Sequence, residues 1–212
     1  MSHYYSEKQD DIESNPFEFI YKFNNHSFKF HTDNGVFSKE YVDYGSYAML
    51  KEFKPKNIDL PILDMGSGYG PIGIIISRLY NKEVHMCEIN ERAYNLSLKN
   101  IKENNANCIA YHSNLYDKLP PNLIFSSIIT NPPIRAGKEV IFSIYEGAYT
   151  HLCEGGELWV VIQKKQGAPS TKTKLEEIFN NCEIIKRDKG YYILKSIKKI
   201  WSRLMPHIFF FI

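Results

Sequence analysis

The sequence predicts one α/β domain with a seven-stranded, mostly parallel sheet and helices on both of its faces. From Ile62 onward, short apolar runs alternate with stretches of helical periodicity, which is typical of parallel strands joined by crossover helices. A glycine cluster follows the first of these runs directly. The chain has 212 residues, 43% apolar and 24% charged, which is the length and composition of a single globular domain.

The residues before Ile62 predict a hairpin followed by a helix. Phe17–Phe23 and Ser27–Thr32 alternate apolar and polar residues as half-buried strands do, and two asparagines between them suit a tight turn. Asp43 is a suitable helix N-cap, and the helix that follows it is expected to run to about Phe53.

The later residues predict the sheet and its helices. The predicted strands are Ile62–Met65, Glu83–Glu88, Cys108–Ser113, Ser126–Thr130, Glu157–Gln163, Cys182–Arg187 and Tyr191–Lys195. The predicted helices are Ile72–Tyr80, Glu91–Asn104, Lys138–Leu152, closed by Gly155-Gly156, and Lys172–Asn180. The turn between the last two strands is too short for a crossover, so this C-terminal hairpin inserts an antiparallel strand into the sheet.

Composition divides the chain into three parts. We expect a loose N-terminus over residues 1–15 and an apolar extension over residues 200–212. Between them lies one domain, made of an N-terminal hairpin and helix (16–58) and a larger core (59–199). The extension is too short to span a membrane, and the polar start predicts no signal peptide. The four cysteines form no C-x-x-C pair, which predicts free thiols, no metal site and a reducing, cytoplasmic location.

Charge is distributed unevenly. The net charge is only +2, but residues 163–199 hold ten Lys or Arg against four Asp or Glu, a local balance of +6. A basic segment of this kind indicates either contact with a polyanion or a solvated surface rich in lysine.

The first motif is Asp64-Met65-Gly66-Ser67-Gly68-Tyr69-Gly70, between a predicted strand and a predicted helix. Its glycines allow a ligand to approach the backbone, and a helix N-terminus attracts acceptor groups. Gly68-x-Gly70-x-x-Gly73 also satisfies the dinucleotide fingerprint, which is built to hold a pyrophosphate. The acid Asp64 instead suits a cationic group such as an ammonium, and a tight turn without a ligand is the third interpretation.

The second feature is Glu88, at the end of the next predicted strand. A carboxylate in that place accepts hydrogen bonds from both hydroxyls of a ribose, or it is simply solvated at the strand end.

The third feature is Asn131-Pro132-Pro133-Ile134, which follows another predicted strand. Two prolines remove two N–H donors and leave carbonyl acceptors beside the asparagine amide, a pattern that can turn the lone pair of an exocyclic amine toward an electrophile.

These three features in this order resemble class I S-adenosylmethionine-dependent methyltransferases, and most closely the small-subunit ribosomal RNA guanine-N2 methyltransferases. The resemblance extends from about His3 to Lys199. Its supporting stretches are Gly35-Val36-Phe37-Ser38, Asn131-Pro132-Pro133-Ile134-Arg135-Ala136-Gly137-Lys138 and Gln163-Lys164-Lys165-Gln166-Gly167-Ala168. Short members of that family carry only the catalytic domain, and the resemblance implies their Rossmann-like fold.

The resemblance also implies roles for individual residues. The cofactor S-adenosylmethionine would be held by Asp64, Gly66, Ser67, Gly68, Gly70, Glu88, Ile89, Asn114, Leu115 and Asn131. Asn114 stands where the family often has Asp, beside the adenine. The catalytic loop would be Asn131, Pro132, Pro133 and Ile134. Ile134 replaces the aromatic residue of the wider group, which stacks on the target ring.

The implied reaction is methyl transfer to guanine N2 in ribosomal RNA or the small ribosomal subunit. Phe37, Arg135, Lys138, Lys164 and Lys165 are the expected substrate contacts, with no metal, no membrane and a monomer favoured. Other acceptors stay open, namely adenine N6 and a protein glutamine amide. A nicotinamide-dependent oxidoreductase and a non-catalytic RNA-binding module are the two further alternatives.

Overall fold

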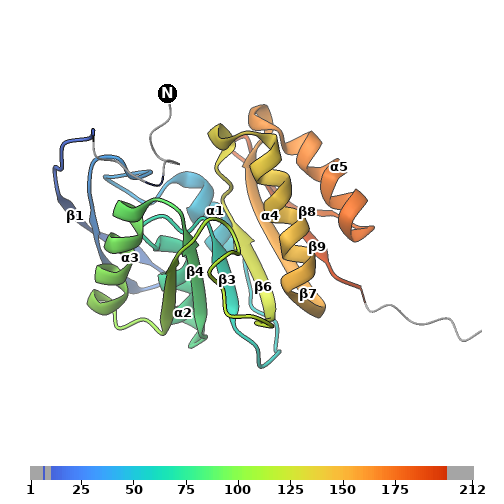
Figure 1. The fold of residues 1–212 in the computed structure, drawn as a ribbon, viewed down its shortest axis with the longest axis horizontal. Helices are drawn as coiled ribbons and strands as arrows, with labels where there is room; N and C mark the ends of the chain where they lie inside the picture. Colours follow the sequence, from blue (N-terminus) through green and yellow to red (C-terminus); the bar gives the residue numbers. More distant parts are fainter. Residues whose placement is uncertain (1–6, 8–10, 200–212) are drawn as a thin grey trace, which may run out of the picture.

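The computed structural model describes residues 7 and 11–199, and its ribbon shows one sheet between two layers of helices (Figure 1). The strands are β1 Phe17–Phe23, β2 His26–Thr32, β3 Ile62–Met65, β4 Val84–Glu88, β5 Cys108–His112, β6 Phe125–Thr130, β7 Leu152–Gln163, β8 Glu183–Asp188 and β9 Tyr191–Ile197. The helices are α1 Tyr44–Glu52, α2 Pro71–Tyr80, α3 Glu91–Glu103, α4 Lys138–His151 and α5 Ala168–Phe179, with short 3-10 turns η2 Ile134–Ala136 and η3 Lys164–Gln166.

The seven-stranded sheet has the order β5-β4-β3-β6-β7-β9-β8. Its first five strands in this order are parallel, while β9 pairs antiparallel with both β7 and β8. This confirms the predicted fold class, including the antiparallel C-terminal hairpin and the separate N-terminal hairpin.

Both faces of the sheet are buried, so neighbouring residues of one strand enter different cores. In β3, Ile62 belongs to the core that α1, α2 and the N-terminal hairpin cover, whereas Leu63 belongs to the core under α4 and α5. The central strands therefore read as continuous apolar runs, and periodicity alone does not assign their faces.

The hairpin β1–β2 is fastened to α3 through its backbone. The Asn100 amide accepts from the His31 N–H (2.7 Å) and donates to the His31 carbonyl (2.9 Å). The Asn104 amide makes the same pair of contacts with Lys29, at 3.0 and 2.8 Å. Two asparagine side chains thus satisfy the strand edge that would otherwise lie open.

Two element boundaries differ from the prediction by more than two residues, the beginnings of α5 and β7. Helix α5 begins at Ala168 and not at Lys172, because Gly167 takes a left-handed conformation (φ 113°) and Pro169 suits a first helical turn. Gly155 and Gly156 lie within β7 and do not close the preceding helix, because their backbones pair with Lys198. The turns η2 and η3 lack a periodic signal and were not expected.

The two ends of the chain carry predictions that lie partly outside the described residues. Within the expected loose N-terminus, Ser14 and the Asn15 N–H donate to the Asp33 carboxylate. The predicted extension over 200–212 lies wholly outside the described part of the chain.

Candidate active site

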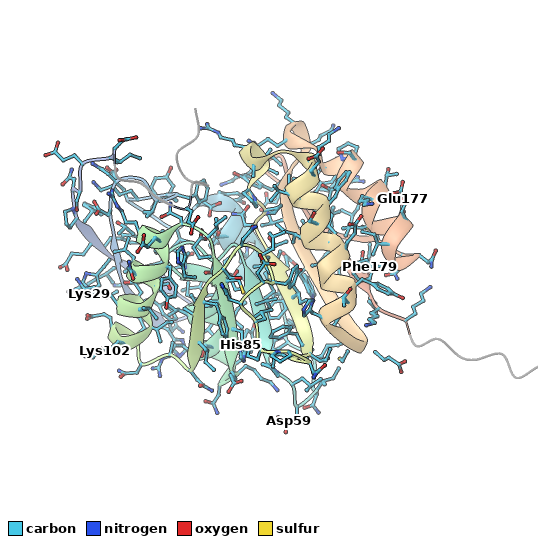
Figure 2. The ribbon with its side chains drawn as sticks, in the orientation of Figure 1. Lys29, Asp59, His85, Lys102, Glu177 and Phe179 are labelled. Atoms are coloured by element: carbon cyan, nitrogen blue, oxygen red, sulfur yellow. The ribbon has the colours of Figure 1, made fainter. Side chains whose placement is uncertain are left out.

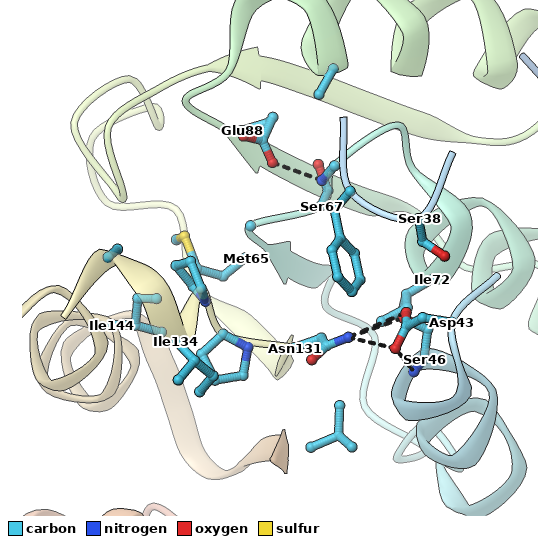
Figure 3. A pocket seen from close by; sticks show the side chains of 18 of the residues that line it. Ser38, Asp43, Ser46, Met65, Ser67, Ile72, Glu88, Asn131, Ile134 and Ile144 are labelled. Carbon is cyan, nitrogen blue, oxygen red and sulfur yellow. Dashed lines mark hydrogen bonds between the residues drawn. The ribbon is translucent and has the colours of Figure 1, made fainter. Parts of the chain in front are cut away.

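A cavity of about 620 Å³ opens at the carboxyl ends of the parallel strands (Figure 3). Its walls come from the loops after β3, β4, β5 and β6, from residues 37–46 before and within α1, and from β7 and β9. The volume is usual for a small-molecule site, and open α/β sheets bind their ligands at this edge.

The glycine turn after β3 forms the floor of the cavity. Gly66 and Gly68 have φ values of 74° and 58°, and a Cβ added to either would meet open space. The Ser67 side chain is buried between them, and its Oγ has no hydrogen-bond partner among the described residues. The turn therefore borders the cavity with open backbone and holds one buried, unsatisfied hydroxyl.

Glu88 connects this turn to the beginning of α3. Its Oε2 accepts from the Gly68 N–H (2.7 Å) and its Oε1 accepts from the Asn90 N–H (2.8 Å). Burial raises the pKa of the carboxyl, which these backbone donors partly oppose. Each carboxylate oxygen retains a second lone pair, so Glu88 can bind a ligand while it holds the turn.

Asp64 lies beneath the turn and outside the cavity wall. Its side chain is 1% exposed, and Oδ2 accepts from the Gly73 N–H in the first turn of α2 (2.8 Å). Burial raises the pKa of the Asp64 carboxyl to about 7, and the Glu88 carboxylate adds to the rise. In this structure Asp64 organises the turn from below.

This pKa predicts a pH-dependent stability. The ordinary Asp value is near 4, so between about pH 4 and pH 7 the folded chain binds more protons than the unfolded one, and the free energy of unfolding falls as pH rises. Asp64→Asn removes this titration, while its amide oxygen still accepts from Gly73. We expect the melting temperature of the ligand-free variant to fall less over this range than that of the wild type. Thermal melts at closely spaced pH values, with the exposed Asp59→Asn as control, check this; parallel curves would contradict it.

The loop after β6 forms the wall opposite the glycine turn. Asn131 donates from Nδ2 to the Asp43 carboxylate (3.3 and 3.4 Å) and to Ser46 Oγ (3.3 Å), as Figure 3 shows. Neither the Asn131 Oδ1 nor the Pro132 carbonyl has a partner within the described part of the chain. The Thr130 hydroxyl donates to the Met65 carbonyl (2.9 Å) and joins this loop to the glycine turn. The site thus offers two adjacent acceptors.

Most of the predicted site residues line this one cavity. They are Phe37, Gly66, Ser67, Gly68, Glu88, Ile89, Asn114, Leu115, Asn131, Pro132, Pro133, Ile134 and Arg135. Five predicted residues do not line it, namely Asp64, Gly70, Lys138, Lys164 and Lys165. Gly70 is the N-cap of α2, with a φ of 97°. The three lysines are exposed at the ends of the two loops.

Sequence reasoning missed the side of the cavity that the N-terminal segment and the C-terminal hairpin build. Asp43, Ser46 and Tyr44 come from the beginning of α1, and Gln163 and Tyr191 come from β7 and β9. Gln163 Nε2 donates to the Tyr191 hydroxyl at 2.6 Å. Asp43 carried a signal, its place as a helix cap, but that signal does not show that the cap faces a loop 88 residues later.

The described residues show two further absences. Over residues 7 and 11–199, no helix is long and apolar enough to cross a membrane. In the same part of the chain, no group of three or more His, Cys, Asp or Glu side chains is placed to hold a metal ion.

A sheet of this order, with a glycine turn and a strand-end acid at the same edge as an N-P-P loop, defines a class I methyltransferase fold. The model of the methyltransferase small domain family matches residues 27–195. The chain therefore belongs to the methyltransferase small domain family.

Curated relatives are of two lengths. The chain is 46% identical over 198 residues to the uncharacterized protein YbxB of Bacillus subtilis, covering 92% of this chain and 98% of that one. It is 28% identical over 169 residues to ribosomal RNA small subunit methyltransferase C of Vibrio cholerae, covering 77% of this chain and 48% of that one. The chain thus spans about half the length of the named ribosomal RNA methyltransferases that it matches.

A solved structure has the same fold. A T. thermophilus 16S rRNA N2 methyltransferase, in complex with AdoMet and guanosine, matches with a TM-score of 0.79 and 25% identity, over 87% of this chain and 51% of that one. The methyltransferases of this family use S-adenosylmethionine as their cofactor. The open glycine turn, the unsatisfied Ser67 hydroxyl and the free lone pairs of Glu88 fit a ligand of this kind.

Proposed function

We propose that this protein transfers a methyl group from S-adenosylmethionine to the N2 amine of a guanine in small-subunit ribosomal RNA. The observation that carries the proposal is the pair of free acceptors, Asn131 Oδ1 and the Pro132 carbonyl, across one cavity from the glycine turn and Glu88. The ribosomal RNA methyltransferases among the relatives, and the guanosine of the T. thermophilus complex, support the choice of acceptor.

The cofactor is held by three strand ends. Gly66, Ser67 and Gly68 would hold its methionine part, Glu88 would accept from its ribose hydroxyls, and the loop after β5 would border its adenine, since all of these line the cavity. In that loop Asn114 and Leu115 line the cavity, and Ile89 lines it from the loop after β4. The Asn114 side chain is exposed and accepts or donates without charge. Asp64 and Gly70 act indirectly, by shaping the turn.

The chain contributes positioning rather than a base. When bound, S-adenosylmethionine supplies a methyl group activated by its sulfonium charge. Asn131 Oδ1 and the Pro132 carbonyl accept hydrogen bonds from the two N–H groups of the target amine. The nitrogen lone pair is then directed at right angles to these two N–H bonds. Holding the reacting groups in this geometry is the main source of the rate.

The target base needs a surface to lie on after it leaves its stack. Ile134 supplies an apolar contact without an aromatic face. Phe37 and Tyr41 line the cavity and are 48% and 63% exposed, a large fraction for aromatic side chains. We place the target base or its neighbour against these rings, because base–aromatic stacking is tolerant of sequence.

The RNA backbone is bound at the rim of the cavity. Arg135 lies within η2 and Lys138 begins α4. Lys164 and Lys165 lie in η3, between the lining residues Gln163 and Gln166. All four are exposed. We place this reaction in the cytoplasm and expect the protein to act as a monomer.

The salt dependence of RNA affinity is expected to come partly from Lys164 and Lys165. Removing one phosphate contact lowers the slope of log affinity against log salt by roughly 0.7–0.9. Lys164→Ala with Lys165→Ala should lower the slope accordingly, measured as binding to a ribosomal RNA fragment over a salt series. The matched control is Lys99→Ala with Lys102→Ala, two exposed lysines of α3 away from the cavity. A double variant with the wild-type slope would place the RNA surface elsewhere.

Nucleoside analysis tests the function itself. Ribosomal RNA from cells with and without the gene is digested and compared by mass spectrometry, and purified protein is then added to the undermethylated free RNA and to subunits. We expect the loss and recovery of one N2-methylguanosine. Loss of an N6-methyladenosine, or of a methylated glutamine in a ribosomal protein, would overturn the choice of acceptor but keep the methyltransferase.

A further inference from the structure

The N-cap of α1 also faces the catalytic loop. Asp43 Oδ1 accepts from the N–H groups of Gly45 (2.9 Å) and Ser46 (3.3 Å), which caps the helix. Its Oδ2 accepts from the Ser46 hydroxyl. Both carboxylate oxygens also lie within 3.4 Å of the Asn131 Nδ2. One side chain thus joins the beginning of α1 to a residue 88 positions later.

These contacts distinguish the two ends of the Asn131 amide. A carboxylate only accepts hydrogen bonds, so the end of the amide that faces it must be the NH₂ group. The Ser46 hydroxyl donates its hydrogen bond to Asp43, which leaves a lone pair on Ser46 Oγ to accept from the same NH₂ group. The oxygen Oδ1 is then directed away from Asp43 and toward the cavity.

We propose that Asp43 is a positioning residue, which holds the Asn131 amide so that its oxygen and not its nitrogen meets the substrate amine. The proposal rests on the proposed function only in naming that amine. A flipped amide would present two donors to a group that itself donates, and the acceptor would be lost. Asp43 acts through Asn131 and is not assigned a contact with the substrate or the reacting atoms.

A substitution that changes one atom of Asp43 separates its role as the helix cap from its role in positioning Asn131. Asn and Asp are about equal as N-caps, because the cap needs one acceptor oxygen. Asp43→Asn keeps that oxygen, Oδ1, which stays 3.3 Å from the Asn131 Nδ2, but replaces Oδ2, 3.4 Å from the same nitrogen, with an NH₂ group. This NH₂ group donates to an Asn131 amide that has turned over, so the preference of Asn131 for one orientation is lost while helix α1 stays capped.

The kinetic test compares Asp43→Asn with the wild type on the RNA substrate. We expect kcat to fall at least about tenfold, with KM for RNA, affinity for S-adenosylhomocysteine and melting temperature close to wild type. The matched control is Asp59→Asn, an exposed aspartate before β3 that does not line the cavity; Figure 2 labels it at the bottom of the molecule. A well-folded Asp43→Asn with the wild-type kcat would overturn the proposal.

A swapped pair tests the orientation directly. In the double variant Asp43→Asn with Asn131→Asp, the new amide at 43 donates to one carboxylate oxygen at 131 and leaves the other oxygen for the substrate. We expect the double variant to be at least about fivefold more active than either single variant. If the cap alone mattered, combining the changes would give no recovery, and that result would count against positioning.

A third measurement does not depend on methyl transfer. The side-chain NH₂ signals of Asn131, assigned by their loss in Asn131→Asp, are followed by NMR in the wild type and in Asp43→Asn. We expect them to be shifted and slow to exchange in the wild type and not in the variant. Identical signals would refute the hydrogen bond. Absence of guanine methylation by the wild type would refute only the proposed function, because this measurement still reports on Asp43.

Discussion

Replacing Asn131 with Ala is expected to slow methyl transfer at least about a hundredfold while the protein still folds and binds its cofactor. The Asn131 Oδ1 is unpaired in the described structure and faces the cavity, so its hydrogen bond to the substrate amine is formed in the reaction complex. That bond strengthens as the nitrogen lone pair turns toward the methyl group, and losing such an interaction lowers turnover. Oriented groups of this kind contribute on the order of 10²–10³ in rate.

The competing interpretation is that Asn131 only shapes the exit from β6 before Pro132. In that case the variant would lose stability, and the rate per folded molecule would stay near wild type. Single-turnover rates measured beside a thermal melt separate the two. The control is Asn107→Ala, an exposed asparagine before β5 at the opposite edge of the sheet. A folded Asn131→Ala with a near-normal rate would remove the residue from the catalytic loop.

Replacing Glu88 with Ala is expected to weaken binding of S-adenosylhomocysteine by about 1–3 kcal/mol, which is roughly 5- to 150-fold. Two effects add in the same direction. The ribose hydroxyls lose their acceptor, and the Gly68 and Asn90 N–H groups lose the carboxylate that holds the turn. Calorimetry measures this affinity directly.

The appropriate control for Glu88 is Glu154→Ala, an exposed acid of β7 outside the cavity. It removes the same charge and should leave the affinity within about twofold. Titration with NAD tests the nicotinamide-dependent oxidoreductase, which the sequence left open as an alternative. Binding of NAD and not of S-adenosylhomocysteine by the wild type would favour an oxidoreductase.

The sheet was predictable because its signals are local. Each parallel strand is a short apolar run that ends in a turn, and Asn90 and Asp43 mark the beginnings of two helices. The errors occurred where tertiary contacts override a local signal. Gly155 looks like a helix stop, yet its N–H pairs with the Lys198 carbonyl at 2.7 Å and extends β7.

The site was predictable where one strand end supplies one function. The glycine turn, Glu88 and Asn131 each follow a strand, and parallel strands bring their carboxyl ends to one edge. The partner of Asn131 was not predictable, because Asp43 belongs to a segment outside the βαβ repeat. The burial of Asp64 was also not predictable, because the sequence shows an acid at a strand end but not whether the loop above it covers its side chain.

The link from Asp43 to Asn131 has a consequence for how the protein is made. At roughly 5–20 residues per second, Asp43 leaves the ribosome on the order of 4–18 seconds before Asn131 does. During the first part of that interval the aromatic side of the hairpin, with Phe28 and Phe30, lacks Tyr69 and helix α3, on which the hairpin packs. The nascent chain therefore exposes an aromatic surface early, and its active site matures only after β6 has been synthesised. Contacts this distant along the chain form slowly, so the link between Asp43 and Asn131 is expected to be completed late in folding.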